Sequence, residues 1–217
     1  MRDSWAGPAP LFIVLEGIDG AGTTTQAERL ITTLANHERR AHATREPSQG
    51  PIGRLLREAL LGGPRSPEGA PLDGDAMALL CAADRRDHLR RAVEPALRGG
   101  QDVVSDRYLL SSLAYQAEEA DRGWVELLAR GIRTPDLTIL LDLPVATAAA
   151  RRRAAGRITE RYDDDQTQNR VATNYRQLAQ TFAGVVVLDG SGDIDAVTRA
   201  ISDTVAALIE RRRGTSA

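Results

Sequence analysis

The chain has 217 residues, of which 42% are hydrophobic and 27% are charged, as is typical of one globular domain. Its formal net charge of −2 argues against a dedicated nucleic-acid-binding protein, and no apolar run approaches the roughly 18 residues that a membrane span needs. A single cysteine, Cys81, excludes an internal disulfide and fits a reducing compartment, so we expect a cytoplasmic protein.

Residues 1–10 lack the apolar segment of a secretory signal, and we expect them to form a flexible tail. Residues 11–15 are a short apolar run that predicts a buried central strand. Gly17 and Gly22 then take the first and sixth positions of a phosphate-binding loop, where glycine lets backbone N–H groups approach phosphate oxygens. A helix starting near Thr23 would direct its positive end toward the same anion.

The loop departs from the usual pattern at one position. The pattern G-x-x-x-x-G-K-[ST] requires lysine where this chain has Thr23, whereas Thr24 still supplies the hydroxyl that binds Mg²⁺. Two interpretations stay open at this point: a nucleotide site without its usual lysine, or a glycine-rich turn with no ligand. The chain contains no lysine, so all 28 basic residues are arginines, and arginine must make every cationic contact to phosphate.

Helices and strands alternate along the rest of the chain. Apolar residues at helical spacing predict a helix over 24–37, and a short strand at 42–45 ends at Arg45-Glu46-Pro47, where Pro47 disfavours a helix. The later predicted elements, in order, are a helix at 52–60, an exposed loop at 64–75, a long helix at 75–97, a strand at 102–106, helices that contain Ser111 and Trp124, a strand at 137–141, an alanine-rich helix after Pro144, a loop at 156–165, a helix through Val171, a strand at 185–188 and a helix after Ile194.

This alternation implies a parallel sheet that is covered on both faces. We therefore predict an α/β fold of the P-loop NTPase type, a three-layer sandwich whose five-stranded parallel sheet has helices on both faces. The residues at the carboxyl ends of the strands should meet at one edge of the sheet, namely Gly17, Arg45, Asp106 and Asp142.

Charged residues gather at this predicted edge. Asp19, Arg45 and Asp106-Arg107 follow three strands, and Asp84-Arg85 lies on the helix between the last two strands. Each arginine alone would be a solvated or structural residue. Together beside a phosphate loop, they indicate a second phosphate and a magnesium ion, as phosphoryl transfer between two nucleotides requires.

Over nearly its whole length the sequence resembles the thymidylate kinase (dTMP kinase) family, through the ordered motifs FIVLEGIDGAG-TTTQ, TREP, AADR, DRY-x-x-SS-x-AYQ, PDLTILLDL and R-x-x-ERYD. The resemblance implies a single nucleoside-monophosphate-kinase-like domain over residues 1–217, with a lid at about 153–165. It also implies phosphorylation of dTMP to dTDP by ATP with Mg²⁺ in deoxynucleotide biosynthesis, and a homodimer. A catalytically impaired homologue that binds nucleotides as a regulator or scaffold is the second hypothesis.

The resemblance also implies roles for individual residues. The predicted ATP-binding residues are Gly17, Gly20, Ala21, Gly22, Thr23, Thr24, Thr25 and Arg151. The predicted dTMP-binding residues are Asp19, Arg45, Arg85, Arg107, Ser112, Gln116 and Tyr162. Magnesium would be held by Thr24 and Asp106, and the predicted catalytic residues are Asp19, Asp106, Arg107, Arg157 and Arg161.

Two further expectations concern the lid and the base pocket. In the family the catalytic arginine lies either in the phosphate loop or in the lid, and here residues 18–21 contain no arginine, whereas the lid contains Arg153, Arg157 and Arg161. We therefore expect the lid to close over ATP, with a solvated lid as the alternative. Cys81 stands where the family usually has a phenylalanine that stacks on thymine, and we interpret Cys81 as a core residue of its helix.

Overall fold

A computed structural model describes residues 9–63, 65 and 69–214 of the chain. Residues 1–8 of the expected tail, and residues 64 and 66–68 of the expected loop, lie outside the described residues. The predicted α/β fold is confirmed: the described chain contains a five-stranded sheet in which every neighbouring pair is parallel. In the order β2-β3-β1-β4-β5, its strands are β2 (Ala41–Arg45), β3 (Asp102–Asp106), β1 (Phe12–Gly17), β4 (Leu137–Asp142) and β5 (Val185–Asp189).

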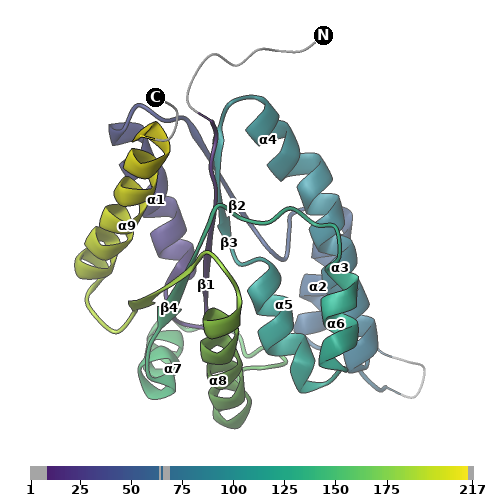
Figure 1. Ribbon diagram of the computed structural model, residues 1–217. Coiled ribbons are helices and arrows are strands. Elements are labelled where there is room, and N and C mark those ends of the chain that lie inside the picture. The colour runs from purple at the N-terminus through teal and green to yellow at the C-terminus, as the bar shows by residue number, and fades with distance from the viewer. Residues whose placement is uncertain (1–8, 64, 66–68, 215–217) are drawn as a thin grey trace.

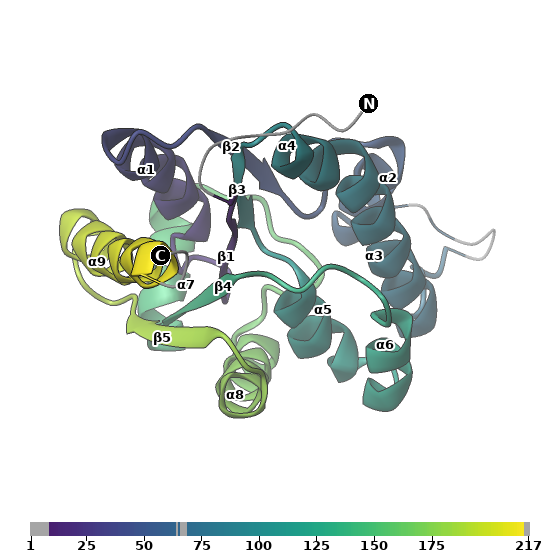
Figure 2. The same cartoon turned by 45° about the horizontal axis from the view of Figure 1, so that its top comes forward.

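Helices connect the strands and cover both faces of the sheet. Figures 1 and 2 show α1 and α9 on one face, with α4, α5 and α8 on the other. The helices are α1 (Thr23–Asn36), α2 (Pro51–Leu60), α3 (Gly74–His88), α4 (Glu94–Arg98), α5 (Leu109–Tyr115), α6 (Arg122–Leu128), α7 (Val145–Ala154), α8 (Asp165–Thr181) and α9 (Ile194–Gly214). None of the described helices has the length and apolar character needed to cross a membrane.

The long helix expected over 75–97 is interrupted by one wider turn. Residues Leu89–Val93 form a π-helix between α3 and α4, and the Glu94 N–H group donates to the Leu89 carbonyl oxygen five residues back. Pro95 lacks an N–H group and its ring crowds the preceding turn of a regular α-helix, so the widened turn accommodates it. The interruption begins directly after His88, the last residue of α3.

The central strand is buried on both faces, and this burial fixes the loop that follows it. Phe12 and Val14 pack toward the π-helix and α4, while Ile13 and Leu15 belong to the larger core that includes α1. Alternate residues of a strand point to opposite faces, so an apolar run without polar interruption suits this position. The run ends with Glu16, which is fully buried, immediately before the loop.

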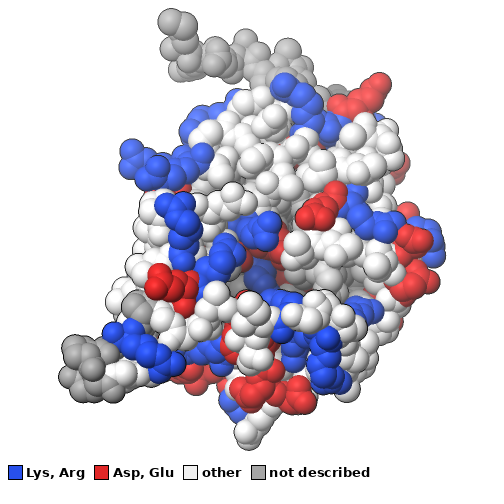
Figure 3. Space-filling model, turned by 180° about the vertical axis from the view of Figure 1, so that it is seen from behind, with Lys and Arg blue, Asp and Glu red and all other residues white. Residues whose placement is uncertain are grey.

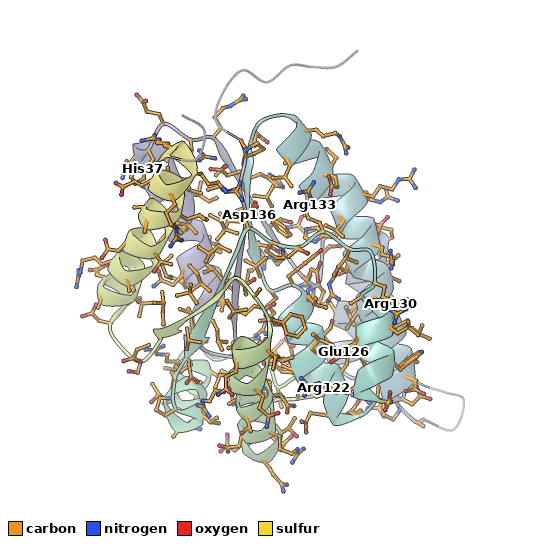
Figure 4. All side chains as sticks on the ribbon, viewed as in Figure 1. His37, Arg122, Glu126, Arg130, Arg133 and Asp136 are labelled. Carbon is orange, nitrogen blue, oxygen red and sulfur yellow. The ribbon has the colours of Figure 1, made fainter. Side chains whose placement is uncertain are left out.

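Ion pairs fix the end of the sheet opposite to the carboxyl ends of its strands. Asp136 accepts the Phe12 N–H group at 2.7 Å and pairs with Arg212, while Arg133 pairs with Glu94 at 2.6 Å. Figure 4 places Asp136 and Arg133 near the loop that leads into β4. Because these contacts secure one end of the sheet, the other end presents loops that are free to form a site.

Candidate active site

The turn between β1 and α1 forms one wall of the site. Gly20 and Gly22 have φ angles of 91° and 94°, in the left-handed region that favours glycine. A Cβ atom at Gly20 would lie 2.4 Å from the Ala148 carbonyl oxygen, so no larger residue fits there. No side chain of the described residues caps α1, which begins at Thr23, and its first N–H groups can therefore bind an anion.

Thr24 and Asp106 come together beside this turn because β1 and β3 are neighbours. The Thr24 hydroxyl donates to Asp106 Oδ2, whereas Asp106 Oδ1 is buried and has no hydrogen-bond partner among the described residues. Those residues contain no group of three or more His, Cys, Asp or Glu side chains that could hold a metal ion. Mg²⁺ commonly binds one or two carboxylates together with substrate phosphates, and the Thr24 hydroxyl and Asp106 Oδ1 fit that mode.

Arg107 and Asp19 form a partly buried ion pair on the other side of the turn. Arg107 has a φ angle of 71°, and its Nη2 donates to Asp19 Oδ1 at 3.0 Å, while its Nη1 donates to the Gly17 carbonyl oxygen at 2.9 Å. Asp19 Oδ2 accepts from Tyr115 at 2.9 Å. Burial alone would raise the pKa of Asp19, but Arg107 and Arg157 outweigh burial, so the pKa is lowered and the carboxylate is ionised.

Glu16 lies beneath Arg107 and organises the start of α5. Its carboxylate accepts from the N–H groups of Tyr108 and Ser111, from the Ser111 hydroxyl and from the Tyr175 hydroxyl. Burial raises the pKa of Glu16, while its hydrogen bond from Ser111 and the charge of Arg107 oppose that shift. The hydroxyl groups of Ser111 and Tyr175 in turn accept from Arg107 Nη1 at 3.2 and 3.3 Å. The same network therefore orients both Glu16 and Arg107.

A second arginine, Arg85, reaches the site from α3. Its Nε donates to Glu46 at 3.0 Å, and its Nη2 donates to the Tyr108 carbonyl oxygen at 3.2 Å and to the Ser112 hydroxyl. Arg85 is only 3% exposed, yet it lies at the cavity wall. Such a cation is held in a fixed orientation, as bidentate recognition of a phosphate requires.

Two more arginines stand at the same end of the site. Arg45 is exposed at the end of β2, and its side chain makes no hydrogen bond or ion pair with the rest of the described chain. Arg57, on α2, donates through Nη2 to the Pro47 carbonyl oxygen at 2.7 Å and also lines the cavity. The sequence did not single out Arg57; its place in the helix that follows the R-E-P segment, ten residues after Pro47, was the only available signal.

The wall between these arginines and the lid is partly apolar. Leu56, Leu60 and Cys81 line it together with the buried polar residues Ser112, Gln116 and Tyr162. Burial raises the pKa of Cys81 to about 12, so the thiol stays protonated. Cys81 thus both packs against the apolar cluster of α2 and α3 and borders the cavity.

Two arginines contact the phosphate loop from this side, Arg157 in the lid segment and Arg152 near the end of α7. Arg157 Nη1 lies 3.6 Å from Asp19 Oδ1, and its Nη2 lies 3.6 Å from Glu160. Arg152 is buried and donates through Nη1 to the Asp19 carbonyl oxygen at 2.6 Å. Sequence reasoning missed Arg152, which belongs to the run of three arginines at the end of α7.

Other arginines of this region have different surroundings. Arg151 donates to the carbonyl oxygens of Gly190 and Gly192 at 2.8 and 3.0 Å, which secures the loop after β5. Arg161 points toward Glu119, with Nε and Nη2 donating to its carboxylate at 3.0 and 2.7 Å, and lies outside the cavity lining. Arg153 is exposed and also lies outside the lining.

These elements enclose a cavity of about 1130 Å³ at the carboxyl ends of the strands. Figure 3 shows a hollow in the rear face with basic side chains around it. All the residues predicted for the site line the cavity except Gly17, which lies at the end of β1, and Arg161. The cavity lining contains seven arginines: Arg45, Arg57, Arg85, Arg107, Arg151, Arg152 and Arg157. Cationic side chains thus surround a cavity that also contains the carboxylates of Asp19 and Asp106.

Comparisons with known proteins agree with this geometry. Residues 15–201 match the family model described as thymidylate kinase. A probable thymidylate kinase of Thermococcus kodakarensis is 38% identical over 208 residues, which cover 94% of this chain and 99% of the relative. A thymidylate kinase of Xanthomonas euvesicatoria is 39% identical over 210 residues, which cover 95% of this chain and 88% of the relative.

Proposed function

This chain belongs to the thymidylate kinase family, and we propose that it transfers the γ-phosphoryl group of ATP to dTMP, giving ADP and dTDP. The observation that best supports the proposal is that a phosphate loop, the carboxylates of Asp19 and Asp106 and seven arginines line one cavity. Phosphoryl transfer needs little covalent chemistry from the protein, because alignment of the two phosphates and neutralisation of their charge provide most of the catalysis.

We place ATP on the loop side of the cavity. The N–H groups at the start of α1 would bind the phosphates of ATP, since glycines 20 and 22 allow close approach of the backbone. Arg151, already fixed by the carbonyl groups after β5, would lie against the adenine ring with its planar guanidinium. Mg²⁺, when bound at Thr24 and Asp106, would neutralise phosphate charge.

We place dTMP on the opposite side. Its 5′-phosphate would meet Arg85 and Arg107, which protein acceptors hold in place, together with the exposed Arg45 and the half-buried Arg57. Ser112 and Gln116 would contact the base, Tyr162 would lie near the sugar, and Asp19 near the deoxyribose hydroxyl. These buried polar groups can discriminate between bases, because an unsatisfied donor or acceptor is costly.

Thr23 stands where a P-loop nucleotide kinase usually carries lysine, and we propose that lid arginines replace that charge. Arg157 is the leading candidate, since its guanidinium lies 3.6 Å from Asp19 at the loop. Its partial exposure and its place in a segment without regular structure allow it to move toward the bridging oxygen when the lid closes. The lid would comprise about residues 153–165 of a single domain spanning residues 1–217.

Three further features belong to the proposal. A homodimer and a cytoplasmic location are expected from family membership and from the single cysteine. ATP and dTMP would be the substrates, with no nucleic-acid or membrane partner. We do not favour the binding-only homologue, because a protein that merely binds nucleotide would not need arginines on both sides of the transfer path.

A coupled assay of ADP release tests the proposal. Wild-type protein should release ADP with ATP, Mg²⁺ and dTMP together, and not when dTMP is left out. Arg85→Ala and Arg45→Ala should raise the KM for dTMP while leaving ATP binding intact. Unchanged dTMP kinetics in both variants would remove these residues from the acceptor site, and absence of ADP release by the wild type would reject the activity itself.

A further inference from the structure

His88, a buried residue outside the cavity, is linked to Arg85 through one carboxylate. His88 Nδ1 lies 3.1 Å from Glu46 Oε1, and Arg85 Nε donates to Glu46 Oε2 at 3.0 Å. All three residues are at most 9% exposed. Each oxygen of the Glu46 carboxylate therefore contacts one residue of α3, either His88 or Arg85. The orientation of the carboxylate depends on both contacts.

The second nitrogen of His88 is also engaged. Its Nε2 lies 2.6 Å from the Thr44 hydroxyl, on strand β2. A carboxylate can only accept, so the short contact to Glu46 puts a proton on Nδ1, and in the neutral ring Nε2 then accepts from Thr44. The contact with Glu46 and the contact with Thr44 therefore favour the same tautomer of His88. The imidazole ring cannot rotate without losing both contacts.

His88 and Arg85 are three residues apart on α3 and therefore lie on one face of the helix. That face meets the segment from Thr44 onward, whose backbone is secured separately, since the Glu46 N–H group donates to the Asp106 carbonyl oxygen at 3.0 Å. The backbone of Glu46 thus does not depend on His88. Only its side chain, and through it Arg85, needs the histidine.

We propose that His88 is a positioning residue for the acceptor phosphate, acting through Glu46 on the guanidinium of Arg85. This role presupposes the proposed function, in which Arg85 binds the 5′-phosphate of dTMP. Glu46 fixes the Nε edge of Arg85, and Tyr108 and Ser112 fix Nη2. Loss of the His88 contact frees the Glu46 carboxylate to rotate, and the Nε edge then loses its fixed acceptor.

Two amide substitutions separate positioning from simple packing. In His88→Asn the side-chain NH₂ group takes nearly the place of Nδ1 and can still donate to Glu46. In His88→Gln the amide lies nearer the place of Nε2, so it reaches Thr44 and leaves Glu46 without its donor. We expect His88→Gln to raise the KM and the Kd for dTMP by roughly fivefold to tenfold, with the KM for ATP unchanged, and His88→Asn to remain near wild type.

His42→Gln is the matched control. His42 is an exposed histidine of β2 whose side chain makes no hydrogen bond with any other described residue, so the same substitution there should leave both KM values unchanged. If His88→Gln does not fold, Thr44→Val removes only the hydroxyl that orients the ring. It should raise the KM for dTMP in the same direction by a smaller factor.

Equal behaviour of the Asn and Gln variants, or parallel rises in both KM values, would overturn the positioning role. The rate at which the Arg85 Nε–H proton exchanges with solvent, measured by NMR on the nucleotide-free protein, gives a second readout. It should accelerate in His88→Gln and not in His88→Asn. If the exchange rates of the two variants differ but the wild type neither binds nor phosphorylates dTMP, His88 does position Arg85 and the proposed function is wrong. If dTMP is phosphorylated but the two variants do not differ, only the positioning role is wrong.

Discussion

The guanidinium of Arg157 lies 3.6 Å from the carboxylate of Asp19, so an arginine of the lid reaches an aspartate of the phosphate loop. Asp19 also binds Arg107 at 3.0 Å. A phosphate group entering between the arginines would compete with Asp19 for Arg157, which is the more exposed of the two. Arg107 is fixed and Arg157 is movable, and this difference suggests distinct roles in binding and in transfer.

Arg157→Ala should lower kcat with little change in either KM, because we expect its charge to meet the phosphoryl group only when the lid is closed. A loss of at least about a hundredfold would be in the range seen when one preorganised donor is removed. Arg153→Ala provides the control, since Arg153 is exposed and outside the cavity lining. Steady-state kinetics in which both variants behave alike would exclude Arg157 as the transfer arginine.

Arg161→Ala should act on stability more than on the chemical step. Arg161 makes hydrogen bonds to Glu119 and to the Leu72 carbonyl oxygen, and thereby ties the lid segment to the loop before α3. We expect a lower Tm, matched by Glu119→Gln, with kcat reduced less than in Arg157→Ala. Calorimetry and steady-state kinetics on the same samples distinguish the two roles. An unchanged Tm together with a strongly reduced kcat would support Arg161 as a catalytic residue.

The parallel fold and many of the cavity-lining residues could be predicted from sequence because each depends on local pattern. The apolar strand before Gly17 and the charged residues after β2 and β3 are each recognisable from neighbouring residues in the sequence. Because the strands are parallel, their carboxyl ends meet at one edge of the sheet and bring these residues together. The direction of a long side chain is not local. Arg157 and Arg161 are four residues apart in one motif, yet one reaches Asp19 and the other Glu119, a choice that depends on acceptors far away in the chain.

The same limit explains the residues that were missed. Arg57 donates to the carbonyl group of Pro47, ten residues before it, and Arg152 donates to the carbonyl group of Asp19, far away in the chain. A sequence gives no sign of which arginine will find such an acceptor. The wider turn after His88 was missed for another reason: helical periodicity continues through it, and only the position of Pro95 hinted at the change.

Cys81 should react slowly with thiol reagents, and bound dTMP should slow it further. Burial raises the pKa of its thiol to about 12, so at pH 8 only about one thiol in ten thousand is thiolate, against about one in four for an ordinary cysteine with a pKa near 8.5. The rate should rise about tenfold per pH unit above pH 8. Iodoacetamide labelling followed by mass spectrometry measures it, and a rate that levels off near pH 9 would contradict the raised pKa.

Cys81→Phe tests whether that side chain faces the base. If it does, an aromatic ring there should lower the KM for dTMP by up to roughly fivefold through stacking, equivalent to about 1 kcal/mol. Because Cys81 also packs against the cluster of Leu56 and Met77, overpacking is the competing result and would appear as a lower Tm. Cys81→Ala controls for loss of the thiol alone. A stable Phe variant with unaltered dTMP affinity would place Cys81 away from the base.

Thr23→Lys should raise kcat, because a lysine at the start of α1 would add a positive charge beside the β- and γ-phosphates of ATP. Without nucleotide that charge is unfavourable at the positive end of the helix, so the variant should have a lower Tm that ATP restores. The neutral Thr23→Gln variant controls for side-chain length. If Arg157 replaces the missing lysine, Arg157→Ala should cost less in the Thr23→Lys background than in the wild type, and additive effects in this double-mutant cycle would reject the replacement. A wild type that forms no dTDP, beside an active Thr23→Lys variant, would instead identify the natural protein as the impaired homologue.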